Sequence, residues 1–269
     1  MKYKVDLHAH TTASDGEYSP AALVEKAKDA GIQWLAVTDH DTIDGVEEAI
    51  RAGERLGITV VRGVELAARE DRHMHILGLG FGPDPVPLKA LCQKLRQSRE
   101  ERKYRIDRFL KEKGVGIPLD EVEQLAGGVP GRPHFARVML RHGLVSSMEE
   151  AFRRYLDTDE YQRIERFKED AAGCIDAIHR SGGKAVLAHP YQLGLSDEKL
   201  ETVIAALKNR GLDGLECYYP RHTPEMVEKY RSLAEKYGLH VSAGSDFHGE
   251  TVRPDTPLIP TLLETDWLA

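Results

Sequence analysis

The sequence predicts an α/β fold in which mostly parallel strands form a barrel or a sheet. Short apolar runs of strand length alternate with amphipathic stretches of helix length at both ends of the chain. Histidine and acidic residues follow these runs directly, at the strand ends where parallel barrels place their active sites. The middle of the chain is charged and helical in pattern, which predicts a helical insertion.

The expected elements follow one another in a regular order. In the first part we expect strands at residues 3–7, 34–38, 59–62 and 75–79, with helices at 20–30 and 46–56. In the last part we expect strands at 185–188, 214–218 and 241–243, with helices at 200–210 and 224–237. The helical pattern of the middle runs from about 88 to 156 and is interrupted by glycine and proline at 127–131. Residues 1–87 and 170–269 are therefore expected to form the barrel, and residues 88–169 a helical insertion that caps the substrate.

Composition narrows the class of protein. A chain of 269 residues is long enough for one large domain with a modest insertion. Its net charge of −7 disfavours nonspecific coating of nucleic acid. The sequence has no apolar stretch of membrane-spanning length, and its start lacks the pattern of a signal peptide. Its three cysteines lack CxxC spacing, which indicates free thiols. We therefore expect a cytoplasmic protein, with no membrane association and no obligate protein partner.

Metal-ligand residue types recur at successive strand ends. His8 and His10 are two apart in a strand, so both imidazoles face one side. Asp246 and His248 repeat this spacing near the end of the chain. Strand ends meet at a barrel mouth, where crowded carboxylates would repel one another unless cations were bound. Imidazole mixed with carboxylate suits zinc, manganese or iron better than calcium. These donors exceed what one ion takes, which predicts two or three divalent ions; the expected metal ligands are His8, His10, Asp15, His40, Glu65, His75, His189, Asp246 and His248.

These motifs together resemble the PHP (polymerase and histidinol phosphatase) family. The matching segments, in family order, are Asp6-Leu7-His8-Ala9-His10, Thr38-Asp39-His40-Asp41, Gly63-Val64-Glu65, His75-Ile76-Leu77-Gly78, Ala188-His189-Pro190 and Gly244-Ser245-Asp246-Phe247-His248. The resemblance implies a distorted (β/α)7 barrel with a trinuclear metal centre.

By position, the resemblance also implies the ligands of each ion. One ion takes His8, His10, Glu65 and Asp246; a second takes Asp15, His40 and His248; a third takes Glu65, His75 and His189. Glu65 is thereby the expected bridge. The residues expected to act in catalysis are Asp15, His40, Glu65, His189 and His248.

A further segment indicates a subgroup. Gly131-Arg132-Pro133-His134-Phe135-Ala136-Arg137, inside the helical insertion, is similar to PHP proteins that act on nucleoside 3′,5′-bisphosphates and on 5′-phosphorylated RNA. Both reactions break the ester at the 3′ oxygen of a nucleotide that carries a 5′ phosphate. The resemblance implies a hydrolase, either a nucleotide 3′-phosphatase or a 5′→3′ exoribonuclease, whose partner is a small phosphorylated nucleotide or a short 5′-phosphorylated RNA. A histidinol-phosphate phosphatase and a noncatalytic, metal-stabilised module remain alternatives.

Several basic residues are candidates for contacting the substrate. The guanidinium fork of Arg132 matches phosphate oxygens, and His134 lies beside it. Arg99 and Arg102 fall near the middle of a helical face, and His222 follows a strand that leads toward the mouth. The alternative interpretation for the arginines is an ordinary solvated basic face or a helix terminus.

Overall fold

The computed structural model describes residues 1–126 and 130–268. Residues 127–129, which hold most of the expected interruption of the insertion, lie outside the described part. The first half of the barrel alternates strands and helices close to the expected bounds: β1 (Lys2–Ala9), α1 (Pro20–Asp29), β2 (Trp34–Val37), α2 (Val46–Leu56), β3 (Thr59–Ala67) and β4 (His75–Leu79). The second half contains α8 (Ala171–Arg180), β5 (Lys184–Leu187), α9 (Asp197–Lys208), β6 (Gly214–Tyr218), α10 (Pro224–Lys236), β7 (His240–Ala243) and β8 (Thr261–Glu264).

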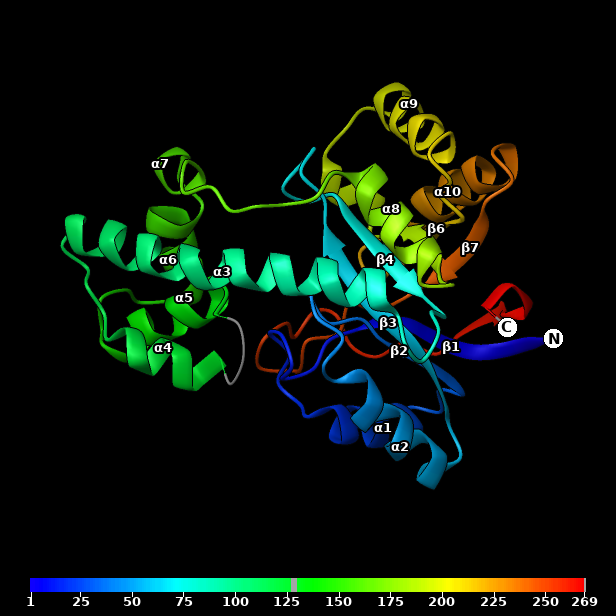
Figure 1. Cartoon of the computed structure of the whole chain (residues 1–269), viewed down its shortest axis with the longest axis horizontal. Coiled ribbons are helices and arrows are strands. Elements are labelled where there is room, and N and C mark those ends of the chain that lie inside the picture. The colour runs from blue at the N-terminus through cyan, green and yellow to red at the C-terminus, as the bar shows by residue number, and fades with distance from the viewer. Residues whose placement is uncertain (127–129, 269) are drawn as a thin grey trace.

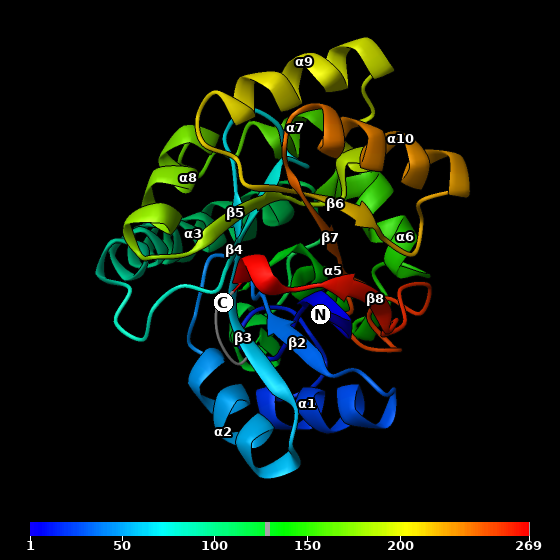
Figure 2. The same cartoon turned by 90° about the vertical axis from the view of Figure 1, so that its right-hand side faces the viewer.

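The strands form one sheet that curls into a nearly closed barrel. Their order is β7-β6-β5-β4-β3-β2-β1-β8. A bridge between Ala9 at the end of β1 and Phe247 in the segment after β7 brings the two sides of the curled sheet together. The helices α1 and α2 lie outside one half of the barrel, and α9 and α10 lie outside the other (Figure 2). The predicted α/β barrel is therefore confirmed.

Strand direction differs from the mostly parallel expectation at two places. The strand β4 runs antiparallel to both β3 and β5. Only residues 68–74 separate β3 from β4, which is too few for the helical crossover that parallel neighbours need. The last strand, β8, was not expected, and it pairs antiparallel with β1.

The strand β3 is longer than expected, because it continues through Gly63 to Ala67. A Cβ atom at Gly63 would lie 2.5 Å from the carbonyl oxygen of Val37, so glycine lets β2 approach closely without ending the strand. Glu65 therefore lies within β3 and not just after it, as the sequence had suggested. It points into the barrel, while its neighbours Val64 and Leu66 pack in the outer core.

The helical segment between β4 and α8 has an apolar core of its own. It comprises α3 (Val86–Glu112), α4 (Leu119–Ala126), α5 (Arg132–Arg141), α6 (Met148–Ala151), a π-helical turn at Phe152–Leu156 and α7 (Asp159–Gln162). The first half of α3 packs with the barrel core through Leu88, Leu91 and Leu95, and its second half packs with the other helices through Ile106 and Leu110. The helices α4 to α7 lie at the opposite end of the molecule from the two termini, and α3 connects them to the barrel (Figure 1).

Candidate metal centre

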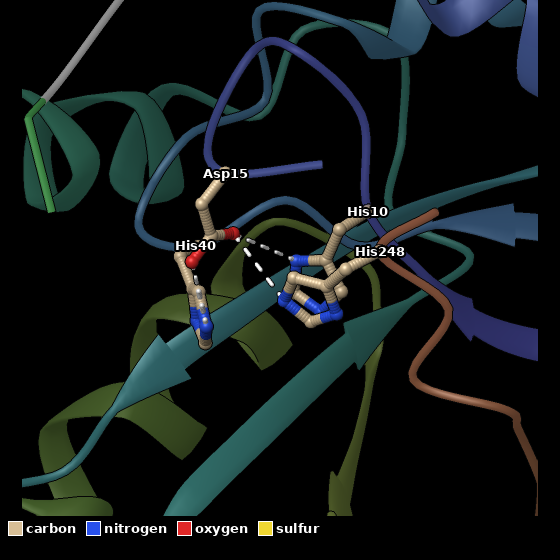
Figure 3. A group of neighbouring side chains, drawn as sticks. All are labelled: His10, Asp15, His40 and His248. Carbon is tan, nitrogen blue, oxygen red and sulfur yellow. Dashed lines mark ion pairs between the residues drawn. The ribbon is translucent and has the colours of Figure 1, made fainter. Parts of the chain in front are cut away.

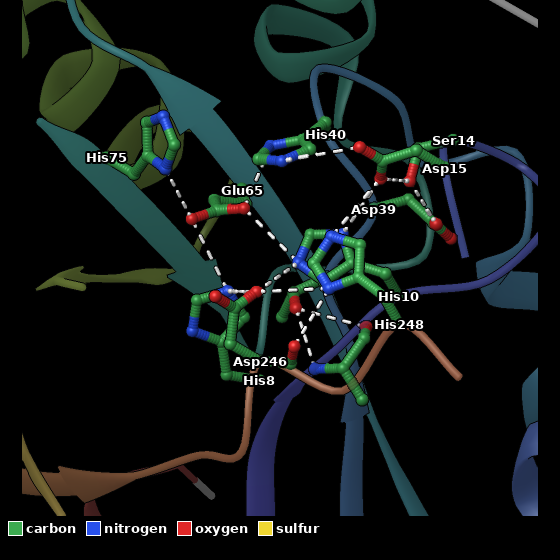
Figure 4. Close-up of polar contacts among 12 residues, drawn as sticks. His8, His10, Ser14, Asp15, Asp39, His40, Glu65, His75, Asp246 and His248 are labelled. Atoms are coloured by element: carbon green, nitrogen blue, oxygen red, sulfur yellow. Dashed lines mark hydrogen bonds and ion pairs between the residues drawn. The ribbon is translucent and has the colours of Figure 1, made fainter. Parts of the chain in front are cut away.

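Nine side chains that the sequence singled out come together at one end of the barrel. Figure 4 labels all of them except His189. His8 and His10 come from the end of β1, and Asp15 comes from the loop that follows. His40 follows β2, Glu65 lies in β3 and His75 opens β4. The remaining three follow β5 and β7: His189, Asp246 and His248. Residues far apart in the sequence thus share one site because the strand ends converge.

Glu65 lies at the centre of the cluster and is 0% exposed. Its Oε1 atom lies 2.7 Å from His75 Nδ1, 3.1 Å from His189 Nε2 and 3.3 Å from His8 Nε2. Its Oε2 atom lies 2.8 Å from His40 Nδ1 and 3.2 Å from His10 Nε2. One carboxylate with imidazoles around both oxygens has the arrangement that a bridging metal ligand needs.

Three groups of donor atoms within the cluster are close enough to hold an ion each. One group is the set expected for the first ion: His8, His10, Glu65 and Asp246. Another contains the expected Asp15, His40 and His248 together with His10 (Figure 3). The third contains Glu65 and His75 with His40 in place of His189, although His189 Nε2 lies only 3.3 Å from His75 Nδ1. The cluster is able to hold metal ions; the assignment of each ligand to one ion remains a prediction.

The pKa values of the cluster show how strongly its charges interact. Burial opposes the charged form of His10, but Asp246 and Glu65 raise its pKa to about 9. Burial also opposes ionisation of Glu65, yet the surrounding imidazoles, His40 and His75 first, hold its pKa well below the usual range. Burial and the positive charge of His10 lower the pKa of His248 to about 4. The carboxylates and imidazoles of this cluster therefore shift one another's pKa values strongly.

Unpaired polar atoms provide a test of whether a metal fits. In the described part of the chain, most buried side-chain nitrogen and oxygen atoms without a hydrogen-bond partner belong to this cluster. They are His8 Nε2, both ring nitrogens of His10, His40 Nδ1, Glu65 Oε2, His189 Nδ1 and His248 Nε2. Buried polar atoms normally have partners. The donor types and their unused lone pairs therefore fit divalent cations.

The backbone is strained around the same site. Among the described residues, the non-glycine residues with positive φ are Asp41 at 54°, His189 at 25° and Asp246 at 54°. Such conformations cost about 1–3 kcal/mol each and persist where the surrounding structure enforces them. Here each one follows a strand and turns a side chain toward or beside the cluster.

The predicted substrate contacts have different environments. Arg99 lies beside the centre, where its Nε and Nη2 atoms donate to Asp41 Oδ2 at 2.8 and 2.6 Å. Arg102 donates from Nε to the carbonyl oxygen of Ile164 at 2.7 Å and stacks over the ring of Tyr161.

The other three candidates have protein partners too. Arg132 pairs with Asp157. His134 is buried, and its Nδ1 atom accepts from the backbone N–H of Gly131 at 2.9 Å. His222 is buried and donates from Nδ1 to the carbonyl oxygen of Cys217 at 2.9 Å, within a group of tyrosines. Whether these residues contact a substrate stays a prediction.

Sequence reasoning missed several residues at the site. Arg166 donates from Nη1 to the same Asp41 Oδ2 atom at 3.0 Å, and Lys168 donates to the carbonyl oxygen of Ala68 at 3.2 Å. Burial and the neighbouring Arg166 lower the pKa of Lys168 to about 8. On the other side, Tyr219 and Arg253 bind the Oδ2 atom of Asp246. The Arg-x-Lys pattern at 166–168 was the available signal, but it lay outside every recognised motif.

The barrel and the imidazoles and carboxylates at its mouth define a protein built to bind metal ions. The family model described as the PHP domain matches residues 6–244. The chain therefore belongs to the PHP domain family.

Named relatives match most of the chain. A 5′-3′ exoribonuclease of Haemophilus influenzae is 36% identical over 249 residues, covering 92% of this chain and 91% of that protein. A 3′,5′-nucleoside bisphosphate phosphatase of Chromobacterium violaceum is 33% identical over 247 residues, covering 91% and 87%. A phosphoribosyl 1,2-cyclic phosphate 1,2-diphosphodiesterase of Eggerthella lenta is 33% identical over 259 residues, covering 91% and 94%. Among solved structures, an amidohydrolase from Chromobacterium violaceum with bound sulfate has a TM-score of 0.86 at 30% identity, covering 98% and 93%.

Proposed function

We propose that this protein is a metal-dependent phosphoesterase that removes the 3′-phosphate from nucleoside 3′,5′-bisphosphates and also degrades short 5′-phosphorylated RNA from its 5′ end. It would use two or three divalent ions of manganese, zinc or iron. Two of the relatives carry names for these two activities. The single observation that carries the proposal in this chain is an excess of cationic side chains beside the candidate metal centre.

That excess comes from four side chains gathered around one carboxylate. Arg99 and Arg166 both donate to Asp41, while Arg102 and Lys168 donate to backbone carbonyl oxygens. The four repel one another: burial, then Arg99, lowers the pKa of Arg166 to about 10. Buried charges are expensive unless paired. A terminal phosphate, with up to two negative charges, would supply the missing compensation, and guanidinium groups match its oxygens.

The position of this cationic cluster supports the proposed substrate. Asp41 follows directly on His40, so the cluster adjoins the candidate metal centre. A substrate with two phosphates would therefore place one at the metals and the other among the cations. A nucleoside 3′,5′-bisphosphate has this form, and so does the first nucleotide of a 5′-phosphorylated RNA.

The reaction is a hydrolysis at the 3′ oxygen. The bond between phosphorus and that oxygen breaks, a bond from phosphorus to the water oxygen forms, and one water proton ends on the leaving 3′ oxygen. Divalent ions, when bound, offset charge on phosphate oxygens and lower the pKa of water toward about 7. Cleavage of RNA at the same bond leaves a new 5′ phosphate on the shortened chain, so the product is again a substrate.

The proposed roles of the residues follow from how deeply each side chain is buried. His8, His10 and Glu65 are fully buried and are proposed to hold metal. Asp15, His40 and His75 have side chains 15%, 15% and 16% exposed, so they form the rim that a substrate meets first. Asp15 and His40 are the proposed proton carriers, with Glu65, His189 and His248 completing the catalytic set.

The remaining features concern the setting of the enzyme. Residues 88–169 are proposed to act as a cap that supplies the cationic side chains. Within the described residues, none of the helices is both long and apolar enough to cross a membrane. The free cysteines Cys92, Cys174 and Cys217 are all buried, which suits the cytoplasmic location that we propose.

The test uses purified protein with adenosine 3′,5′-bisphosphate and manganese, followed by chromatography of the products. The proposal expects 5′-AMP and phosphate. Formation of 3′-AMP would mean that the two phosphate sites are assigned in the wrong order. A metal-loaded sample that turns over histidinol phosphate instead, or no phosphoester at all, would favour the two alternatives.

The contribution of the cationic cluster is tested with a pair of variants. Arg166→Met removes a largely buried guanidinium, and Arg163→Met removes an exposed one three residues earlier. Hydrogen bonds to charged groups contribute about 1.5–3 kcal/mol, or roughly 10- to 100-fold in rate. We expect Arg166→Met to lower kcat/KM for the bisphosphate by that factor and to leave kcat/KM for 3′-AMP, which lacks the 5′ phosphate, much less affected. Equal losses on both substrates would refute the subsite.

A further inference from the structure

A tenth side chain, an acidic one, lies at the candidate metal centre without belonging to the expected ligand set. Glu216 is in the middle of β6 and is fully buried. Its neighbours Leu215 and Cys217 pack in the outer core, so strand alternation points Glu216 into the barrel. A buried carboxylate in this position needs hydrogen-bond donors as partners.

One oxygen of Glu216 binds the imidazole of His8. Glu216 Oε1 lies 3.0 Å from His8 Nδ1. A carboxylate accepts hydrogen bonds, so the neutral His8 ring that metal binding requires would carry its proton on Nδ1 and present the lone pair of Nε2 on the other side. That Nε2 atom faces Glu65 Oε1 at 3.3 Å and Asp246 Oδ1 at 3.6 Å, within the first group of candidate ligands.

The other oxygen of Glu216 holds a second candidate ligand through its backbone. Glu216 Oε2 accepts from the backbone N–H of His189 at 2.6 Å. His189 has a φ of 25°, a strained conformation for a residue with a side chain. The hydrogen bond restrains that conformation, and the His189 Nε2 atom then lies 3.1 Å from Glu65 Oε1.

The space around Glu216 is closely fitted. A Cβ atom at Gly244 would lie 2.6 Å from Glu216 Oε1 and 2.2 Å from His8 Cβ. Glycine at this point of the chain after β7 therefore lets the carboxylate and the imidazole meet. The backbone amide, the ring and the carboxylate form one connected unit across β1, β5, β6 and β7.

We propose that Glu216 is a positioning residue that couples two of the ions: it orients His8 for one and His189 for another without binding either metal itself. This inference rests on the metal binding proposed above, although it does not depend on which phosphoester is the substrate. Outer hydrogen-bond partners of metal-binding histidines typically change metal affinity or activity by about 10- to 100-fold when they are removed.

The experiment compares Glu216→Ala and Glu216→Gln with a control, Cys217→Ala, which removes a buried side chain from the same strand on its outer side. Metal content is measured by mass spectrometry and manganese affinity by calorimetry. Burial opposes the charged form of His8, but Glu216 and Glu65 hold its pKa well above the usual range. Nitrogen NMR of the histidines is therefore recorded on metal-free protein at a pH high enough for the ring to be neutral, where it reports which ring nitrogen of His8 carries the proton. These readouts do not require turnover, so they separate a failure of this inference from a failure of the proposed reaction.

We expect Glu216→Ala to lose affinity at two ion sites by about 10- to 100-fold. We also expect it to lose the preference of His8 for a proton on Nδ1. Glu216→Gln keeps one acceptor oxygen but places an amide N–H₂ against either His8 or His189, so it should weaken one site more than the other. If Glu216→Ala does not fold, the glutamine variant and the NMR measurement still test whether Glu216 positions His8 and His189. Metal affinities equal to those of the wild type, or an equal loss in Cys217→Ala, would overturn the proposal.

Discussion

The ion pair between Asp41 and the cap is the contact whose loss should have the clearest consequence. Asp41→Asn removes one negative charge and leaves the side-chain shape nearly unchanged. Asparagine also tolerates the observed φ of 54°, so backbone strain does not complicate the comparison. The substitution leaves Arg99 and Arg166 facing a neutral group, with Arg102 and Lys168 still nearby.

The magnitude follows from the geometry. Asp41 Oδ2 accepts hydrogen bonds from Arg99 at 2.8 and 2.6 Å and from Arg166 at 3.0 Å, and Asp41 is 0% exposed. Breaking a buried ion pair by removing one partner costs about 3–5 kcal/mol. Since whole proteins are stable by about 5–15 kcal/mol, this is a large share of the total. The neighbouring pair of Asp44 with Arg96 has side chains 60% and 40% exposed, so Asp44→Asn should cost about 0.2–1 kcal/mol.

The assay is urea unfolding of the wild type and both variants, monitored by circular dichroism in metal-free buffer with and without inorganic phosphate. Phosphate should stabilise Asp41→Asn more than the wild type, because it replaces the missing negative charge. Equal stability losses in Asp41→Asn and Asp44→Asn would refute the reasoning. An absence of any extra stabilisation by phosphate would refute the anion site alone.

Three further outcomes are expected. Treatment with EDTA should abolish phosphoesterase activity and lower the Tm, and added manganese should restore both. A Tm that EDTA does not change would contradict metal binding at this centre. Lys168, with a pKa of about 8, is charged below that pH and neutral above it, so kcat/KM for the bisphosphate should fall as pH rises through about 8. Lys168→Arg should move that fall to higher pH. Identical pH profiles of the variant and the wild type would show that Lys168 is not the titrating group. Gly244→Ala should destabilise the protein by about 1–3 kcal/mol and reduce its metal content. The control Gly57→Asn should do neither, because a Cβ atom at Gly57 meets nothing within 4 Å. Equal effects of the two substitutions would contradict the close packing at Gly244.

Much of the barrel could be predicted from local sequence. Strands such as Trp34–Val37 and helices such as Val46–Leu56 carry short apolar runs and amphipathic spacing, with a glycine after the helix. The direction of β4 could not be predicted in the same way, because an apolar run of five residues fits either direction. The length of β3 was underestimated because glycine often ends a strand. Here Gly63 lies within β3 and allows β2 to approach closely.

The candidate metal centre was accessible to sequence reasoning because its residue types stand at strand ends. His8 and His10 share one face by spacing alone, and barrel closure brings Glu65, His189 and Asp246 to the same mouth. The cationic cluster was only partly accessible. Arg99 and Arg102 were recognisable on a helical face, but their partners Asp41 and Ile164 lie on other elements.

The sequence by itself determined the alternation of strands and helices, the chemical types of the nine candidate ligands and their order along the chain. The tertiary structure decided that Glu65 lies between imidazoles on both of its oxygens, that Arg166 joins Arg99 on Asp41, and that Glu216 supports His8 and His189. The physical reason is one of distance. Spacing fixes which residues share a face of one element, whereas contacts between residues on different elements depend on how the sheet closes and how α3 packs across it.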